Sequence, residues 1–339
     1  MSILTAFQTG VRRVGSAPAV LLGVAALTLL AALPLGLALR PMIEESLGAS
    51  LAGHTAASGA DPAWWQQFSE EAVGVGRAFT PSTVGFAGVL DNLASVADNR
   101  SHLAVVGVAG LAYVFVWTFL AGGILDRYAR GRATRSAGFF AASGVFFFRF
   151  LRLAIVAAAA YAALFGGLHA WLFGSIYPAL ARDLTVERQA FAIRLTLYVI
   201  FGATLSLVNL VFDYAKVRAV VEDRRSMLGS LTAALGFLRR HPAGAIGLYL
   251  MDGACFVAVV AAYGFVAPDA SAPLWWILLA GQAYLLARLF VRLLFFASEV
   301  AFFQGALAHS EYTAAPLPVW PDSPAAEAIV SAKGGQQVS

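Results

Sequence analysis

The chain has 339 residues, of which 60% are hydrophobic and only 12% are charged, and its mean hydropathy is +0.75. Soluble domains carry about twice that share of charged residues, so the composition excludes an ordinary soluble protein and indicates an integral membrane protein. The formal net charge of +4 sits on basic residues that cluster beside apolar segments, so we expect lipid partners and no nucleic acid.

Six segments are long and apolar enough to cross the hydrocarbon layer as helices, which takes about 20 residues each. In chain order they run from Ala19 to Leu39, His102 to Leu125, Leu151 to Phe173, Phe191 to Phe212, Ala243 to Val266 and Leu274 to Phe296. The first resembles a signal peptide, but its apolar run is too long and lacks a small-residue cleavage site. We therefore predict an uncleaved anchor and an all-α, polytopic fold.

The segment 41–101 separates the first two predicted spans and is acidic. Its stretch "STVGFAGVLDNLASVAD" from Ser82 has apolar residues at helical spacing, and "WWQQF" from Trp64 supplies aromatics typical of the headgroup level. We expect the first stretch to lie on the outer membrane face. The alternative is that both stretches pack together as a small outer cap.

Basic residues near the predicted span ends are concentrated on the side that holds the N-terminus. By the positive-inside rule, this asymmetry predicts that both termini are cytoplasmic.

The odd-numbered spans are each preceded by an apolar stretch with two closely spaced arginines. These six are Arg12, Arg13, Arg149, Arg152, Arg239 and Arg240. The even-numbered spans end at Asp126, Asp213 and Glu299, at nearly equal spacing. The pattern predicts three parallel units, each a cytoplasmic interfacial helix followed by a membrane hairpin. The alternative is an ordinary topology without duplication.

Guanidinium groups at the inner interface attract anionic headgroups, so the six arginines are candidate lipid contacts. A basic collar of this kind also suits a nucleotide or the acidic tail of a partner. The alternative is that these arginines only anchor the topology.

Ionisable groups inside spans are costly and are therefore candidates for function. Asp252 lies in the fifth span, and Arg288 and Arg292 lie in the sixth. We expect Asp252 and Arg288 to meet as an ion pair that either fixes the packing or forms a polar site. Transport is favoured if Asp252, Arg288 and Asn209 line a polar cavity. No catalytic motif, metal-ligand pattern or cofactor motif appears, so we expect no enzyme activity.

The segment 313–339 is rich in Pro, Ala, Ser and Gly, which predicts a disordered cytoplasmic tail after a membrane domain of residues 1–312. The tail, through "PLPVWP", or the outer loop is a candidate site for a protein partner.

Two stretches carry a resemblance to a known family. These are "FLAGGILDRYAR" at Phe119 to Arg130 and "FDYAKVRAVVEDRRSMLGSLTAALGFLRRHP" at Phe212 to Pro242. Both resemble segments of uncharacterised bacterial multi-span membrane proteins, and are distantly similar to the membrane domain of some glycerophosphodiester phosphodiesterases. The resemblance carries no catalytic residues and implies a multi-pass protein of the bacterial inner membrane.

The function that we expect from the sequence is a non-enzymatic module that scaffolds, assembles or regulates other envelope components. The alternative is a small transporter or channel that uses a polar site between spans five and six. An enzyme would need a second carboxylate or a histidine near Asp252 in space.

Overall fold

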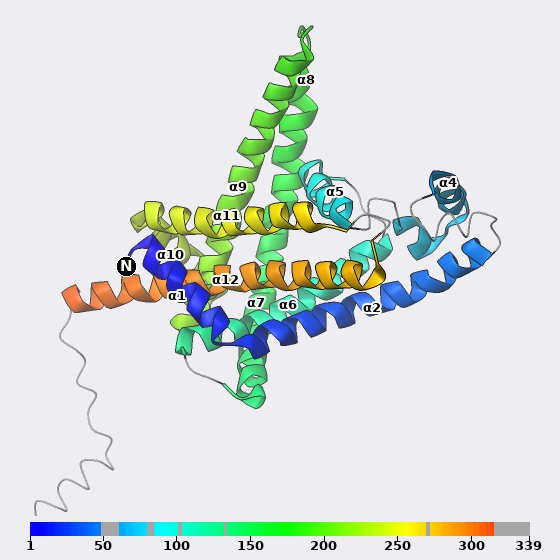
Figure 1. The fold of residues 1–339 in the computed structure, drawn as a ribbon. Coiled ribbons are helices and arrows are strands. Elements are labelled where there is room, and N and C mark those ends of the chain that lie inside the picture. The colour runs from blue at the N-terminus through cyan, green and yellow to red at the C-terminus, as the bar shows by residue number, and fades with distance from the viewer. Residues whose placement is uncertain (49–60, 80–84, 101–103, 132–133, 269–271, 315–339) are drawn as a thin grey trace, which may run out of the picture.

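The computed structural model describes residues 1–48, 61–79, 85–100, 104–131, 134–268 and 272–314, and its regular elements there are all helices (Figure 1). Five of these helices are long and apolar enough to cross a membrane. They are α2 (Pro18–Gly48), α6 (Ala104–Arg130), α7 (Ser136–Ala163) with its continuation to Ala181, α9 (Glu187–Val221) and α11 (Pro242–Val266). The all-α fold class is thus confirmed.

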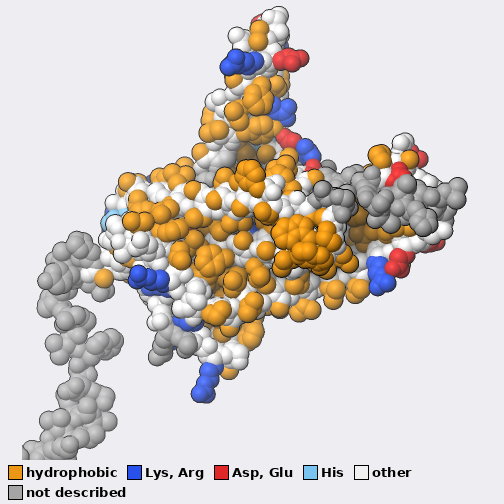
Figure 2. Space-filling model, viewed as in Figure 1, with side chains coloured by type: hydrophobic (Ala, Val, Ile, Leu, Met, Phe, Trp, Pro, Cys, Tyr) orange, Lys and Arg blue, Asp and Glu red, His pale blue; other side chains and the backbone are white. Residues whose placement is uncertain are grey.

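Large apolar side chains cover the outside of these helices. Leu30, Leu111, Ile155 and Leu250 are all exposed. Figure 2 shows hydrophobic side chains over most of the visible face, with charged side chains at its edges and near the tip of the upright hairpin. A surface of this kind is stable in lipid rather than in water, so the protein is membrane-embedded.

The remaining long helix, α12 (Leu274–Ala314), contains the sixth predicted span, but it is not among the five helices that qualify. It extends past the predicted span end at Phe296 and takes in the first two residues of the predicted tail, 313–314. The rest of that tail lies outside the described residues. Six complete spans therefore stay a prediction.

The first predicted span also ends later than expected, since α2 continues through Pro34 and Pro41 to Gly48. Beyond the predicted end at Leu39, an ion pair one turn apart, Arg40 Nε to Glu44 Oε1 at 2.7 Å, lies on the extended helix.

Two of the three predicted interfacial helices are separate elements. α1 (Ile3–Gly15) ends before Pro18, which is the first residue of α2. In the same way, α10 (Met227–Arg240) ends before Pro242, which is the first residue of α11. Proline is favoured in the first turn of a helix and cannot continue a preceding one, so it sets both breaks. The stretch with Arg149 and Arg152 has no such break and forms one continuous helix with its span, α7.

Each of these three stretches packs on the C-terminal end of a long helix. α1 lies on α12, the first half of α7 lies on α6, and α10 lies on α9. Contacts are close enough to require small residues: a Cβ on Gly10 would lie 2.9 Å from Ser298 Cα, and one on Gly123 would lie 2.8 Å from the Phe139 carbonyl oxygen.

The largest fully buried side chains gather at these same helix ends. They include Leu125 and Tyr128 of α6, Tyr214 of α9, and Leu294 and Phe303 of α12. The core therefore lies where the interfacial stretches meet the C-terminal ends of α6, α9 and α12.

The long helices do not share one direction. In Figure 1 the hairpin of α7 and α9 stands steeply across α11 and α12, which run side by side. α7 continues into this hairpin through two π-helical stretches, η3 (Leu164–His169) and η4 (Leu172–Ile176), and then α8 (Tyr177–Ala181).

The described parts of the outer loop form α4 (Pro62–Glu71), the 3-10 helix η1 (Gly74–Ala78) and α5 (Gly85–Ala97), so the predicted helical stretch from Ser82 is a helix over its described part. Trp64 and Phe68 of α4 pack with Leu39 and Met42 of α2. α5 instead contacts α11, where Phe86 lies on Tyr263, with ring centroids 6.2 Å apart. The two stretches thus attach to different helices.

Candidate functional site

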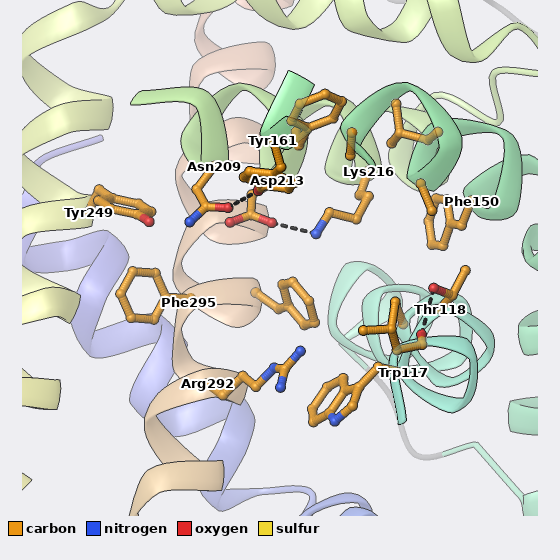
Figure 3. A pocket seen from close by; sticks show the side chains of 17 residues that line it. Trp117, Thr118, Phe150, Tyr161, Asn209, Asp213, Lys216, Tyr249, Arg292 and Phe295 are labelled. Atoms are coloured by element: carbon orange, nitrogen blue, oxygen red, sulfur yellow. Dashed lines mark hydrogen bonds and ion pairs between the residues drawn. The ribbon is translucent and has the colours of Figure 1, made fainter. Parts of the chain in front are cut away.

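A cavity of about 410 Å³ lies where α6, α7, α9, α11 and α12 meet (Figure 3). We call it the central cavity. Apolar and aromatic side chains form most of its wall, and each of the five helices contributes at least one polar or charged group. The polar and charged members are Thr118, Tyr161, Asn209, Asp213, Lys216, Tyr249 and Arg292. This volume and mixture are typical of small-molecule sites.

One wall of the central cavity comes from α9. Asn209, Asp213 and Lys216 are three or four residues apart, so the helical period brings them to one face. Lys216 Nζ lies 2.5 Å from Asp213 Oδ1. Tyr161 of α7 donates its hydroxyl hydrogen to Asn209 Oδ1.

The opposite wall contains Arg292 of α12 and Trp117 of α6. The Arg292 guanidinium carbon lies 3.7 Å from the centroid of the Trp117 ring, a close cation–π contact. Arg292 Nη1 also donates to the Tyr113 hydroxyl over 3.4 Å. Among the residues that the structure describes, Arg292 has no carboxylate partner, and Figure 3 shows it across the cavity from Asp213 and Lys216.

The formal charges of the cavity wall do not cancel. Asp213 balances Lys216, and the charge of Arg292 remains, so the lining carries one net positive charge. In surroundings of low dielectric constant such a charge attracts an anion strongly.

The structure does not bring Asp252 and Arg288 together. Asp252 is fully buried and its Oδ2 accepts a hydrogen bond of 2.6 Å from Ser298 of α12. Arg288 is exposed and lies about 15 Å along α12 from Ser298 at helical rise. Ser298 rather than Arg288 therefore faces Asp252, and the predicted ion pair is absent from the described contacts.

For a transporter, the sequence predicts Asn209, Asp252 and Arg288 in the wall of one polar cavity. Asn209 lines the central cavity, whereas Asp252 and Arg288 do not. Arg292, which sequence reasoning placed near Asp252, lines the cavity with a different set of partners. Asp213 and Lys216 were visible in the motif "FDYAKVR", but there they indicated only a span end and the cytoplasmic side.

A second carboxylate lies near Asp252. Glu299 is within electrostatic range of both Asp252 and Asp213, and its carboxylate oxygens have no hydrogen-bond partner within the described chain. Both Asp252 and Glu299 are buried, and neither lines the central cavity.

Two of the six arginines proposed as lipid contacts are bound to other parts of the protein. Arg13 Nη2 donates to Gln304 Oε1 over 2.8 Å, and Arg149 Nη1 donates to Asp223 Oδ1 over 2.6 Å. The contact with Arg149 lowers the pKa of Asp223. The side chains of Arg12, Arg152, Arg239 and Arg240 are exposed and remain candidates.

No group of three or more His, Cys, Asp or Glu side chains that suits a metal ion occurs among the described residues. His169 is instead packed between aromatic rings, and its Nε2 lies 2.9 Å from the Ala97 carbonyl oxygen.

Comparison of the chain with protein-family models, curated proteins and solved structures finds no match. The resemblance to bacterial multi-span proteins therefore stays a prediction.

Proposed function

We propose that this protein binds a small, singly charged organic anion in its central cavity, as the binding step of transport across a membrane. The observation that carries the proposal is Arg292, which is stacked on Trp117 and faces the Asp213–Lys216 pair across the cavity without a carboxylate of its own. An organic anion complements both the net positive charge and the aromatic wall.

The position of the cavity favours transport over simple binding. Charged side chains within apolar helices are costly to insert in a membrane, and where they persist they commonly mark the path of a solute. Here they come from helices of different hairpins, namely Lys216 and Asp213 on α9 and Arg292 on α12. A small relative movement of the hairpins would change which side the cavity faces.

The topology that suits this function has six spans, with α12 as the sixth, arranged as three hairpins with both termini in the cytoplasm of a bacterial inner membrane. The packing of α1 on α12, of α7 on α6 and of α10 on α9 supports three related units.

Binding is tested on purified protein in detergent with benzenesulfonate and hexanesulfonate, whose charge is permanent. We expect both to raise the thermal unfolding midpoint, because a ligand that binds only the folded state stabilises it. Arg292→Gln is expected to weaken binding at least about tenfold, which is about 1.4 kcal/mol.

Arg288→Gln is the matched control, because it removes the same charge from the same helix at an exposed position outside the cavity. It should bind as the native protein does. Equal affinity in Arg292→Gln and the native protein would exclude the central cavity as the site. Uptake of radiolabelled benzenesulfonate into proteoliposomes then tests movement, and binding without uptake would leave a receptor rather than a transporter.

The scaffold function expected from the sequence stays a prediction, because its proposed partner sites, the outer loop and the tail, lie partly or wholly outside the described residues. Pulldown with and without residues 315–339 tests the tail. Co-purification of a defined envelope protein that is lost on truncation would favour this function over transport.

A further inference from the structure

A second cavity, of about 310 Å³, lies at the other side of α6, and we call it the Arg127 cavity. It is formed by the junction of α1 and α2, the C-terminal half of α6 and the start of α7. Its walls are mostly apolar, with Val20, Val24, Leu27, Leu120 and Phe140 among them. An apolar wall of this composition accommodates a hydrocarbon chain.

One charged side chain lines this cavity. Arg127 is 8% exposed, and within the described part of the chain it has no hydrogen bond or ion pair. The adjacent carboxylate of Asp126 pairs with Arg130 instead, whose single Nε–H is shared between Asp126 Oδ1 and Oδ2 at 2.8 and 2.9 Å. A mostly buried guanidinium without a counter-charge attracts an anion strongly, because the surrounding dielectric constant is low.

The position of Arg127 suits an anion at the membrane surface. It follows the predicted cytoplasmic end of the second span at Leu125, and the hydroxyl-bearing residues Ser16, Thr134 and Ser136 line the same cavity. Hydroxyls and guanidinium groups are the usual donors to phosphate oxygens. The apolar side chains of α2 and α6 line the remainder.

We infer that the Arg127 cavity binds one anionic phospholipid, with its phosphate on Arg127 and part of an acyl chain against Val24, Leu27 and Leu120. This site is distinct from the exposed arginines on the cytoplasmic side, which attract anionic lipid diffusely, and from the central cavity, since the two share no lining residue. The inference does not depend on the proposed transport function.

Native mass spectrometry of the full chain tests it, after exchange into detergent micelles that contain dioleoylphosphatidylglycerol or dioleoylphosphatidylcholine. We expect the native protein to retain one phosphatidylglycerol at a collision energy that removes the others. Arg127→Gln should reduce that retained fraction at least tenfold. Arg288→Gln, which removes an equal charge from an exposed position outside the cavity, should leave it unchanged.

A second variant tests the acyl part without altering the charge. Gly23 lines the cavity, and a Cβ there meets no atom within 4 Å, so the backbone accepts a side chain at this position and Gly23→Leu places apolar atoms in the cavity. We expect this variant to stay folded and to lose the retained lipid. Retention by Arg127→Gln equal to that of the native protein would overturn the site. Equal retention of phosphatidylcholine would overturn its charge selectivity, and displacement of the lipid by inorganic phosphate alone would overturn the role of the acyl chain.

Discussion

At the residue scale, Asp252 illustrates how a buried carboxylate is held without a cation. Its Oδ2 accepts a hydrogen bond from Ser298, and its Oδ1 has no partner in the described structure. An amide oxygen accepts the same hydrogen bond, so the carboxylate charge is not needed for this contact.

Asp252→Asn is therefore expected to fold normally. Its thermal unfolding midpoint should equal or exceed that of the native protein, because removal of a buried charge that lacks a salt bridge does not cost stability. Benzenesulfonate binding should be unchanged, since Asp252 does not line the central cavity. Loss of folded protein would instead show that packing at this position needs the charge of Asp252.

Asp213→Asn tests the charge of the central cavity in the opposite direction from Arg292→Gln. Removal of the carboxylate leaves Lys216 without its partner and raises the net charge of the wall from one positive charge to two. We expect affinity for benzenesulfonate to increase about tenfold, measured by isothermal titration calorimetry. Weaker binding would mean that Asp213 acts by orienting Lys216 rather than by neutralising it.

The sequence identifies which residues are costly to bury but not which ones meet. Arg292 and Asn209 were recognisable as polar groups in apolar spans, and both line the cavity. The partner of Asp252 was not predictable, because serine has no charge and Ser298 is one of many hydroxyls. The choice between Ser298 and Arg288, which lie about 15 Å apart along α12, depends on how far α12 is shifted and rotated against α11, and a mostly apolar helix surface does not specify this.

At the element scale, the contact between α1 and α12 depends on a residue without a side chain. A Cβ at position 10 would lie 2.9 Å from the N, Cα and Cβ atoms of Ser298, and the backbone atoms cannot move aside cheaply. By contrast, a Cβ on Gly15, at the end of α1, meets nothing within 4 Å.

Gly10→Ala should lower the free energy of unfolding by about 1–3 kcal/mol, because α1 is forced away from α12. Gly15→Ala is the control and should be neutral or slightly stabilising, since alanine favours the helix. Thermal unfolding of both variants in the same detergent measures the difference. Equal midpoints would show that α1 shifts without cost.

A carboxylate just beyond α5 joins this helix to α9, and its environment predicts that the contact depends on pH. Tyr198 of α9 donates a hydrogen bond to Asp98, just beyond α5, and Arg100 Nη2 lies 3.0 Å from Asp98 Oδ2. These contacts lower the pKa of Asp98 below its ordinary value of 3.8, although burial opposes the change. A lowered pKa means that the stabilisation is complete above the unfolded value and is lost as pH falls through the folded one.

We therefore expect the amides of α5 to exchange hydrogen faster in Asp98→Asn than in the native protein near pH 6. The difference should disappear at a pH below the folded pKa, where both side chains are neutral. Hydrogen–deuterium exchange with mass spectrometry measures both proteins at the same pH. The effect of pH on the intrinsic exchange rate of each amide is then the same in both and cancels from the comparison. A difference that persists in acid would assign the effect to packing.

At the scale of the whole molecule, the sequence predicts helix existence better than helix arrangement. Segment length and hydropathy indicated the apolar helices, and Pro18 and Pro242 marked the starts of α2 and α11. The directions of the long helices were not predictable. Nothing in their apolar sequences specifies the steep angle between the α7–α9 hairpin and α12 (Figure 1). Close packing at one helix end is visible where Gly123 of α6 lies on Ser143 of α7, since a Cβ on Gly123 would lie 2.5 Å from Ser143 Oγ.

The contact between α1 and α12 also constrains the order of assembly. Gly10 meets Ser298, and Arg13 bonds Gln304, so α1 docks on a helix that is synthesised after every other helix described here. During synthesis the part of α1 that packs on α12 stays uncovered until α12 leaves the ribosome, although α11, which also contacts α1, is made earlier. Closure of the core is therefore a late event, and a chain that stops before α12 keeps that face of α1 open to chaperones and proteases.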